Sequence, residues 1–170
     1  IKLDKTETKK MVNTIPRSSV LGFIIGVLPG AGATIASFLA YGMERNFVND
    51  EEKQKFGKGS VNGIAAPETA NNAACSGSFV PLLTLGIPGS GTTAVMLGAL
   101  LGFGIQPGPR LYQTNPEIFW SVIMSMYIGM VVLLILNLPL IPYIARVLAT
   151  PRTFLIPLIL FFSLTGVYLM

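Results

Sequence analysis

Two long uncharged segments, each interrupted near its centre by the motif Pro-Gly-x-Gly, constrain this sequence more than any other feature. The first covers residues 19–43 and is interrupted at residues 29–32, and the second covers residues 79–104 and is interrupted at residues 88–91. Each segment is long enough to cross a bilayer, which takes about 20 apolar residues in a helix. Because proline removes a backbone donor and glycine permits left-handed geometry, we expect a break in each helix.

Charge is scarce and concentrated outside these segments. Asp, Glu, Lys and Arg make up 12% of the chain, about half the share of roughly 25% that is usual in soluble domains. A soluble domain of this size could not cover its surface with so few charges, whereas lipid solvates the outer face of a membrane protein. We therefore predict an all-α fold, a polytopic membrane helical bundle with Pro/Gly-broken or re-entrant helices.

The basic residues gather in the two segments that flank the first apolar run. Residues 1–18 and 44–60 are both rich in Lys and Arg, which places both on the cytoplasmic side under the positive-inside rule. Residues 19–43 would then form a re-entrant hairpin with its tip at the break, each arm of about nine residues reaching ~14 Å. A broken spanning helix is the alternative. The basic residues do not alternate with aromatics, so no nucleic-acid binding is expected.

The remaining segments follow from the same patterns. The chain opens on Ile1 and closes within an apolar run, so we expect the parent protein to be longer and the last span to be truncated. The predicted organisation is a broken or re-entrant segment at 19–43, a loop at 44–60, a polar helix at 61–78, a broken segment at 79–104, a loop at 105–117, a span at 118–141 and a truncated span at 154–170.

The two breaks are the predicted substrate site. Inside a bilayer, unpaired backbone groups are tolerated only where protein or water satisfies them, and broken transporter helices use such groups to bind substrate and ions. The helix that follows a break offers N–H groups and a positive dipole end to an anion. Hydroxyl residues follow both breaks, and small-residue pairs at 22/26, 26/30 and 98/102 leave open the alternative of kinks that serve only packing. The residues we expect to bind substrate are Gly30, Gly32, Thr34, Ser37, Asn71, Asn72, Gly89, Ser90, Gly91, Thr92 and Thr93.

One acid stands apart from the charged flanks. Glu68 is the only acid between Glu52 and Glu117, and Asn71 and Asn72 follow it on one helical face. An ionisable residue at membrane depth is a functional hypothesis, which makes Glu68 the candidate for ion coupling. The alternative is that Glu68 caps an interfacial helix after Pro67.

Enzymatic alternatives find little support. The chain has no histidine and a single cysteine, so neither a metal cluster nor a nucleophile–base pair is expected, and we predict that it is not an enzyme and has no cofactor. Residues 86–93 differ by one residue from a phosphate-binding loop, because the position of its essential lysine holds Thr92. A membrane-embedded enzyme and a non-transporting packing or scaffold subunit are the alternatives in other functional classes.

The strings GVLPGAGATIASFLAYGMER, PETANNA and GIPGSGTTA are specific enough to suggest a family. Over residues 14–170 the chain resembles the large transmembrane subunit of tripartite tricarboxylate transporters. The family motifs fall on residues 29–34, 68–72 and 88–93 without departure. The resemblance implies that residues 1–170 are a partial transmembrane transporter domain from the C-terminal half of that subunit.

The resemblance also implies a function. We expect symport, the uptake of small carboxylates such as citrate and other tricarboxylates driven by a gradient of Na⁺ or H⁺. The expected location is the bacterial inner membrane, as a multi-pass protein. The expected partners are a small membrane subunit, a periplasmic solute-binding protein and the lipid bilayer. Since the first half is absent, this chain alone is not expected to transport.

Overall fold

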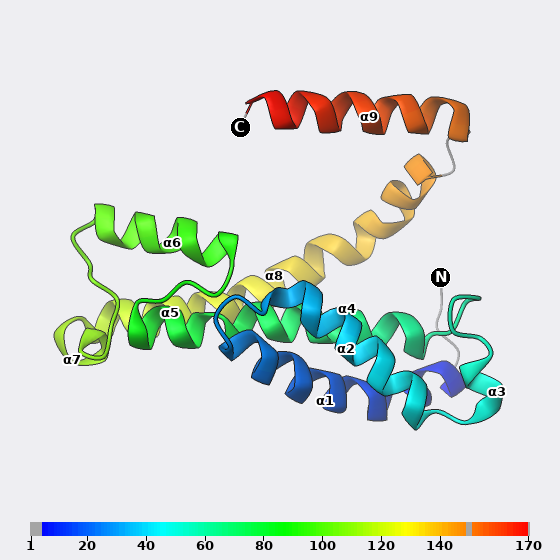
Figure 1. Cartoon of the computed structure of the whole chain (residues 1–170), viewed down its shortest axis with the longest axis horizontal. Helices are drawn as coiled ribbons and strands as arrows, with labels where there is room; N and C mark the ends of the chain where they lie inside the picture. The colour runs from blue at the N-terminus through cyan, green and yellow to red at the C-terminus, as the bar shows by residue number, and fades with distance from the viewer. Residues whose placement is uncertain (1–4, 149–150, 170) are drawn as a thin grey trace. The chain divides into compact units, whose positions relative to one another are not determined.

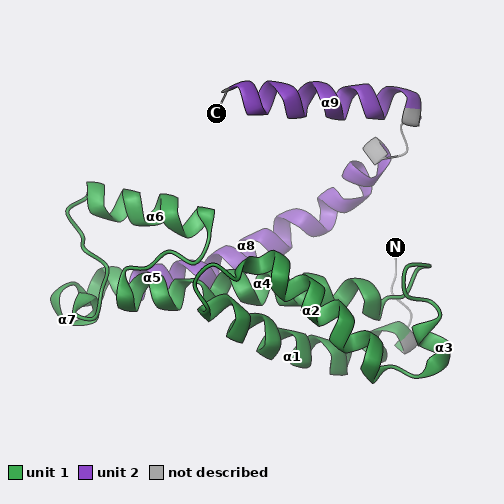
Figure 2. Ribbon diagram, viewed as in Figure 1, with its two compact units in different colours: residues 1–119 green, residues 120–170 purple. Residues whose placement is uncertain are grey.

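The computed structural model describes residues 5–148 and 151–169, and these residues form helices and connecting turns without a strand (Figure 1). The prediction of an all-α chain is confirmed. The chain divides into two compact units, residues 1–119 and residues 120–170 (Figure 2).

The first unit contains three longer helices and several short ones. Both Pro-Gly-x-Gly segments lie between helices, the first after α1 and the second after α5. The elements are α1 (Lys5–Val27), α2 (Gly32–Phe47), α3 (Asp50–Lys53), α4 (Asn62–Gly77), α5 (Phe79–Leu85), α6 (Gly91–Gly102) and α7 (Leu111–Thr114).

The second unit consists of most of α8 (Pro116–Leu148) together with α9 (Arg152–Leu169). Within α8, the stretch Pro116–Arg146 is long and apolar enough to cross a bilayer, judged by length and composition, and it is the one such helix among the described residues. Its large apolar side chains are exposed along its length.

Helices α1, α2 and α4 pack together through small residues. The buried apolar cluster consists of alanines from α2 and α4, namely Ala36, Ala40, Ala66, Ala70 and Ala74. The tightest approach is between α1 and α4, where a Cβ added to Gly22 would lie 2.6 Å from Ala70 Cα, and one added to Gly26 would lie 2.6 Å from Ala74 Cα. Glycine at both positions therefore lets the two helix backbones meet.

The contacts fix the direction of each helix. Thr14 bonds to Asn62 across 48 residues, and Gly22 faces Ala70 at the same offset, so α1 and α4 run parallel. Helix α2 runs antiparallel to both, because Ser37 bonds to Pro67 while Glu44, seven residues later, bonds to Asn62. One end of this three-helix group therefore carries Glu44 and Asn62, and the other carries the first break.

The helix bounds differ in several places from those read off the sequence. Helix α1 begins at Lys5, inside the flank that precedes the first apolar segment, and α2 extends to Phe47 in the predicted loop at 44–60. The reason is that charges in these flanks pair with one another, Lys10 with Glu52 and Arg17 with Glu44, and so are held within packed helices.

The remaining helices also differ from the predicted bounds. Helices α3 and α7 lie in predicted loops, and α8 extends beyond 118–141 at both ends. The last predicted span, 154–170, corresponds to α9, and its residue 170 lies outside the described residues.

Candidate functional site

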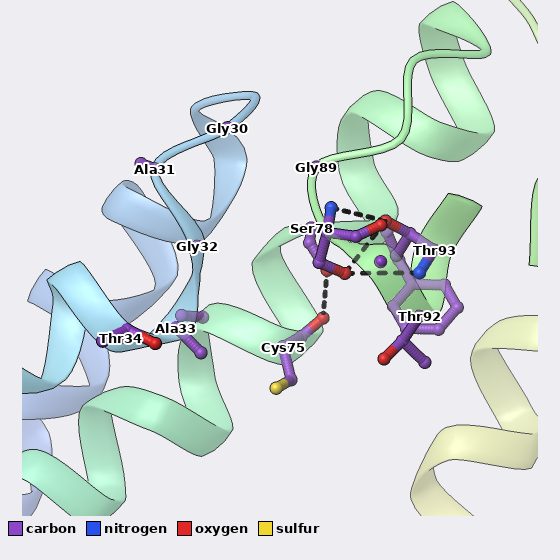
Figure 3. Close-up of a pocket in the computed structure, with 14 residues that line it drawn as sticks. Gly30, Ala31, Gly32, Ala33, Thr34, Cys75, Ser78, Gly89, Thr92 and Thr93 are labelled. Carbon is purple, nitrogen blue, oxygen red and sulfur yellow. Dashed lines mark hydrogen bonds between the residues drawn. The ribbon is translucent and has the colours of Figure 1, made fainter. Parts of the chain in front are cut away.

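A cavity of about 620 Å³ lies in the first unit, where the two breaks meet the end of α4. Figure 3 shows residues 30–34 on one side, Gly89, Thr92 and Thr93 on the other, and Cys75 between them. The lining residues are small or hydroxyl-bearing, apart from one aromatic: Gly30, Ala31, Gly32, Ala33, Thr34, Ala74, Cys75, Ser78, Phe79, Gly89, Ser90, Gly91, Thr92 and Thr93.

The first break is a turn built on two glycines with left-handed backbone. Gly30 has φ of 83° and Gly32 has φ of 68°, a region in which a residue with a side chain is strained. Helix α2 begins at Gly32, and Ala31 at its N-cap supplies no side-chain hydrogen bond. The first-turn N–H groups of a helix have no partner within it, so this end of α2 faces the cavity without a side-chain cap.

The second break is capped by its own side chains. Ser90 is extended (φ −153°, ψ 167°), and its Oγ accepts from Thr93 N–H at 3.2 Å while Ser90 N–H donates to Thr93 Oγ1 at 2.8 Å. Thr93 is 1% exposed. This reciprocal capping box holds the start of α6 in place and engages both hydroxyls within the protein.

The wall between the breaks comes from the C-terminal end of α4. Ser78 donates to the Cys75 carbonyl at 2.8 Å, and a Cβ added to Gly89 would lie 3.3 Å from Ser78 Cβ. The second break therefore packs directly on the end of α4. Cys75 is exposed and is the one cysteine in the sequence.

Most of the residues that we expected to bind substrate meet at this cavity. Eight of them line it: Gly30, Gly32, Thr34, Gly89, Ser90, Gly91, Thr92 and Thr93. Thr34 and Thr92 are exposed and form no side-chain hydrogen bond within the described residues, whereas Ser90 and Thr93 bond to each other.

The other predicted site residues lie elsewhere on the unit. Ser37 donates to the carbonyls of Ala33 and Pro67, at 3.0 and 3.2 Å, and so connects α2 with α4. Asn72 donates to the Glu68 carbonyl at 2.8 Å on an exposed face of α4. None of Ser37, Glu68, Asn71 and Asn72 is among the residues that line the cavity.

The cavity offers hydrogen-bond groups without formal charge. No lining residue in the described chain is acidic or basic. What it presents instead is the start of α2, the start of α6 and hydroxyl groups, and helix N-termini favour negative charge. The chemistry that suits this lining is non-covalent binding of an anion.

A buried polar cluster, which the sequence patterns did not indicate, connects α1, α2 and α4 at their other end. The Glu44 carboxylate is fully buried. Its Oε1 accepts from Thr14 Oγ1 at 2.7 Å, Arg17 Nη2 at 2.8 Å and Asn62 Nδ2 at 3.2 Å, and Arg17 Nη2 also lies 2.9 Å from Oε2. We call Thr14, Arg17, Glu44 and Asn62 the polar clamp. The sequence feature that could have indicated it is that Thr14 on α1 and Asn62 on α4 are each followed by small residues at every fourth position.

A second ion pair lies in the flanking segments, outside the apolar runs. Lys10 Nζ is 2.7 Å from Glu52 Oε2, and Ser60 Oγ donates to Glu52 Oε1 at 2.8 Å. The hydrogen bond from Lys10 holds the pKa of Glu52 below its usual value. The same bond raises the pKa of Lys10.

Comparisons with known proteins agree with the resemblance noted from the motifs. The tripartite tricarboxylate transporter TctA family matches residues 1–170. The chain is 43% identical, over 98% of its length and 33% of the other protein, to an uncharacterized 52.8 kDa protein in the TAR-I ttuC' 3' region of Agrobacterium vitis. It is 46% identical, over 86% of its length and 60% of the other protein, to an uncharacterized protein in the TAR-II ttuC' 3' region of the same organism.

The chain thus spans one third of the first relative and three fifths of the second. No solved structure matches it. The family match covers the whole chain, including both breaks and the polar helix between them. The chain belongs to the tripartite tricarboxylate transporter TctA family.

Proposed function

We propose that this chain is part of a secondary active transporter that takes up small carboxylates, such as citrate and other tricarboxylates, and that substrate binds between the two helix breaks. The family is a tripartite tricarboxylate transporter family, which supports the substrate class. The observation that carries the location is that two matching Pro-Gly-x-Gly segments, far apart in the sequence, line one cavity of about 620 Å³.

The binding groups follow from what each break leaves free. At the start of α2 the first-turn N–H groups have no side-chain cap, and Thr34 adds a hydroxyl. At the start of α6, Ser90 and Thr93 are engaged in the capping box, so Thr92 supplies the available hydroxyl. We propose that Thr34 and Thr92 bind substrate carboxylates directly and that Ser90 and Thr93 hold the second break in shape.

Charge balance supports coupling to a cation gradient. A carboxylate in this cavity would meet no cationic side chain from the described residues, so a co-transported Na⁺ or H⁺ would offset its charge. Glu68 is an exposed acid on α4 and stays the proposed coupling residue, with Asn71 and Asn72 beside it. Glu68→Gln in the full-length protein should shift the ion dependence of uptake, and an unchanged dependence would remove Glu68 from the proposal.

The setting of the whole protein is part of the same proposal. We propose a polytopic bundle in the bacterial inner membrane that acts with a small membrane subunit and a periplasmic solute-binding protein. The apolar stretch Pro116–Arg146 and the exposed apolar side chains of α9 support placement in a bilayer. The helices on either side of each break would be discontinuous membrane helices, with their unpaired groups facing the cavity.

Uptake and binding by the full-length transporter test the site. A hydrogen bond to a charged group contributes about 1.5–3 kcal/mol, so Thr34→Val and Thr92→Val should each weaken carboxylate binding roughly 10- to 100-fold. Thr84→Val is the matched control, because Thr84 is an exposed threonine on α5 that bonds to the Val80 carbonyl outside the cavity. Unchanged affinity in both cavity variants would refute the assignment.

A packing or scaffold role predicts a different result. Cys75 lines the cavity and is exposed, so a maleimide should label it in the full-length protein from which other cysteines have been removed. Bound carboxylate should slow that labelling and raise the temperature of unfolding. A scaffold would show neither effect at any carboxylate concentration.

A further inference from the structure

The contacts between alanines of α4 and glycines of α1 recur every four residues, so they leave open which residues of the two helices face each other. On α4 the buried alanines recur every four residues, at 66, 70 and 74, and on α1 the facing glycines recur at 22 and 26. A shift of α4 by four residues, about 6 Å along its axis, would again bring a small residue against each glycine: Ala66 and Ala70 in one direction, Ala74 and Ser78 in the other. The alanine–glycine contacts alone therefore do not select one alignment, although Gly77, where a Cβ would lie 3.2 Å from Gly26 Cα, disfavours a larger residue at the break end of α4.

The polar clamp differs between those alignments. Glu44 is fully buried, and its carboxylate receives donors from α1 (Thr14 and Arg17) and from α4 (Asn62). A shift of α4 by one turn would remove the Asn62 amide and bring Ala66 to its level. Because the carboxylate is buried, water would not replace the lost hydrogen bond, and Glu44 keeps all three donor residues in one register only.

The polar clamp and the cavity lie at opposite ends of α4. It joins the beginning of α4 to α1 and to the end of α2, while the cavity is lined by the other end of α4 and the beginning of α2. Since helices are stiff, the register chosen at the clamp is transmitted along α4 to Cys75 and Ser78. A one-turn shift would move both residues by about 6 Å relative to the first break.

We infer that Thr14, Arg17, Glu44 and Asn62 are positioning residues that set the register of α4 against the α1–α2 hairpin and so place Cys75 and Ser78 opposite the first break. A polar group that fixes alignment in an otherwise permissive apolar interface is an attested use of buried polarity. A cation-binding role suits the cluster less well, because Arg17 already neutralises Glu44. The effect on substrate binding rests on the proposed function, whereas the register itself does not.

Pulsed electron paramagnetic resonance on the full-length transporter tests the register. Spin labels on Ile24→Cys in α1 and Ile64→Cys in α4, in a background without other cysteines, occupy exposed positions (56% and 64%). The test variant replaces the whole clamp with apolar residues, Thr14→Val, Arg17→Met, Glu44→Leu and Asn62→Leu, because removing every partner together leaves no unpaired buried charge.

With the native clamp we expect one narrow distance distribution. With the apolar clamp we expect additional populations displaced by several ångström, as α4 takes up neighbouring registers. The matched control is Glu52→Gln, which breaks the Lys10 ion pair in the same region but leaves the clamp intact, and it should keep the native distribution. A single native distribution in the apolar-clamp variant would overturn the inference.

A second variant and an affinity measurement cover the remaining outcomes. If the apolar-clamp variant does not accumulate, Asn62→Leu alone removes the α4 donor and should broaden the distribution, and an unchanged distribution there would equally overturn the inference. Carboxylate affinity should fall about tenfold or more in the variants with mixed register and stay unchanged in Glu52→Gln. Mixed register with unchanged affinity would overturn the positioning role, whereas a native protein that binds no carboxylate at all would refute the proposed function and leave the register result standing.

Discussion

The close approach of α1 and α4 makes a quantitative prediction about Gly22. A Cβ at this position would lie 2.6 Å from Ala70 Cα, whereas carbon atoms in contact are separated by about 3.5–4.0 Å. Gly22→Ala therefore forces the two helices apart by about 1 Å or distorts one of them. Overpacking of this kind costs about 1–3 kcal/mol.

The substitution also brings a gain that must be subtracted. Alanine is favoured over glycine within a helix by about 1 kcal/mol, so the net effect of Gly22→Ala is smaller than the packing cost. Gly42→Ala is the matched control, because Gly42 lies within α2 and a Cβ there would meet no atom within 4 Å. We expect the control to be stabilising by about 0.5–1 kcal/mol and Gly22→Ala to be destabilising.

Fluorescence-detected thermal unfolding of the purified full-length protein measures the difference between the two variants. Both exchange the same residue types in a helix, so propensity cancels in the comparison and the close contact remains. The Gly22→Ala variant should unfold at a lower temperature than Gly42→Ala. Equal unfolding temperatures would refute the claim that the α1–α4 interface is closed at this point.

Three further variants test other contacts. Ser90→Ala removes the cap of α6 and should cost about 1 kcal/mol, seen as faster amide hydrogen exchange in its first turn; unchanged exchange would contradict the capping box. Arg17→Met leaves the Glu44 carboxylate buried without its counter-charge and should destabilise by about 3–5 kcal/mol in thermal or chemical unfolding, while a neutral effect would show that the carboxylate is not held as described. The pKa of Glu52 is lowered and that of Lys10 is raised, so their ion pair should stabilise the folded protein at neutral pH. This stabilisation should be lost as the pH falls below about 4.5 and Glu52 takes up a proton, and also as the pH rises above about 10.5 and Lys10 gives one up. Glu52→Gln should abolish the acid-side change, and an identical pH profile in that variant would exclude the pair as its source.

The helix breaks could be predicted because their causes are local. Proline and glycine act on the backbone of their own residues, so the end of α1 and the starts of α2 and α6 follow from the Pro-Gly-x-Gly segments, and the end of α5 follows from Gly86, whose backbone is left-handed. That the two segments meet at one cavity was an expectation drawn from their similarity. The different use of their hydroxyls could not be predicted from the motif: residue 31 is alanine where the aligned residue 90 is serine. Thr93 therefore bonds to Ser90 in a cap, whereas Thr34 forms no side-chain hydrogen bond within the described part of the chain.

The polar clamp could not be predicted in the same way, because its partners are far apart in the sequence. Glu44 lies 30 residues from Thr14 and 18 from Asn62, and the acid sits at the edge of a charged segment that reads as a solvated loop. Only the packing of three helices brings these side chains together. The same packing explains why α1 and α2 extend into segments that composition alone assigns to loops.

Because the chain is synthesised from its N-terminus, the counter-charge of the buried Glu44 is made before Glu44 itself. Arg17 precedes Glu44 by 27 residues, so the guanidinium on α1 is already present when α2 emerges and folds back at the first break. A lone carboxylate would resist transfer into apolar surroundings, whereas the Arg17–Glu44 pair carries no net charge and can be buried together when the hairpin forms. Asn62 is made 18 residues later, which would let α4 dock onto a hairpin that is already assembled.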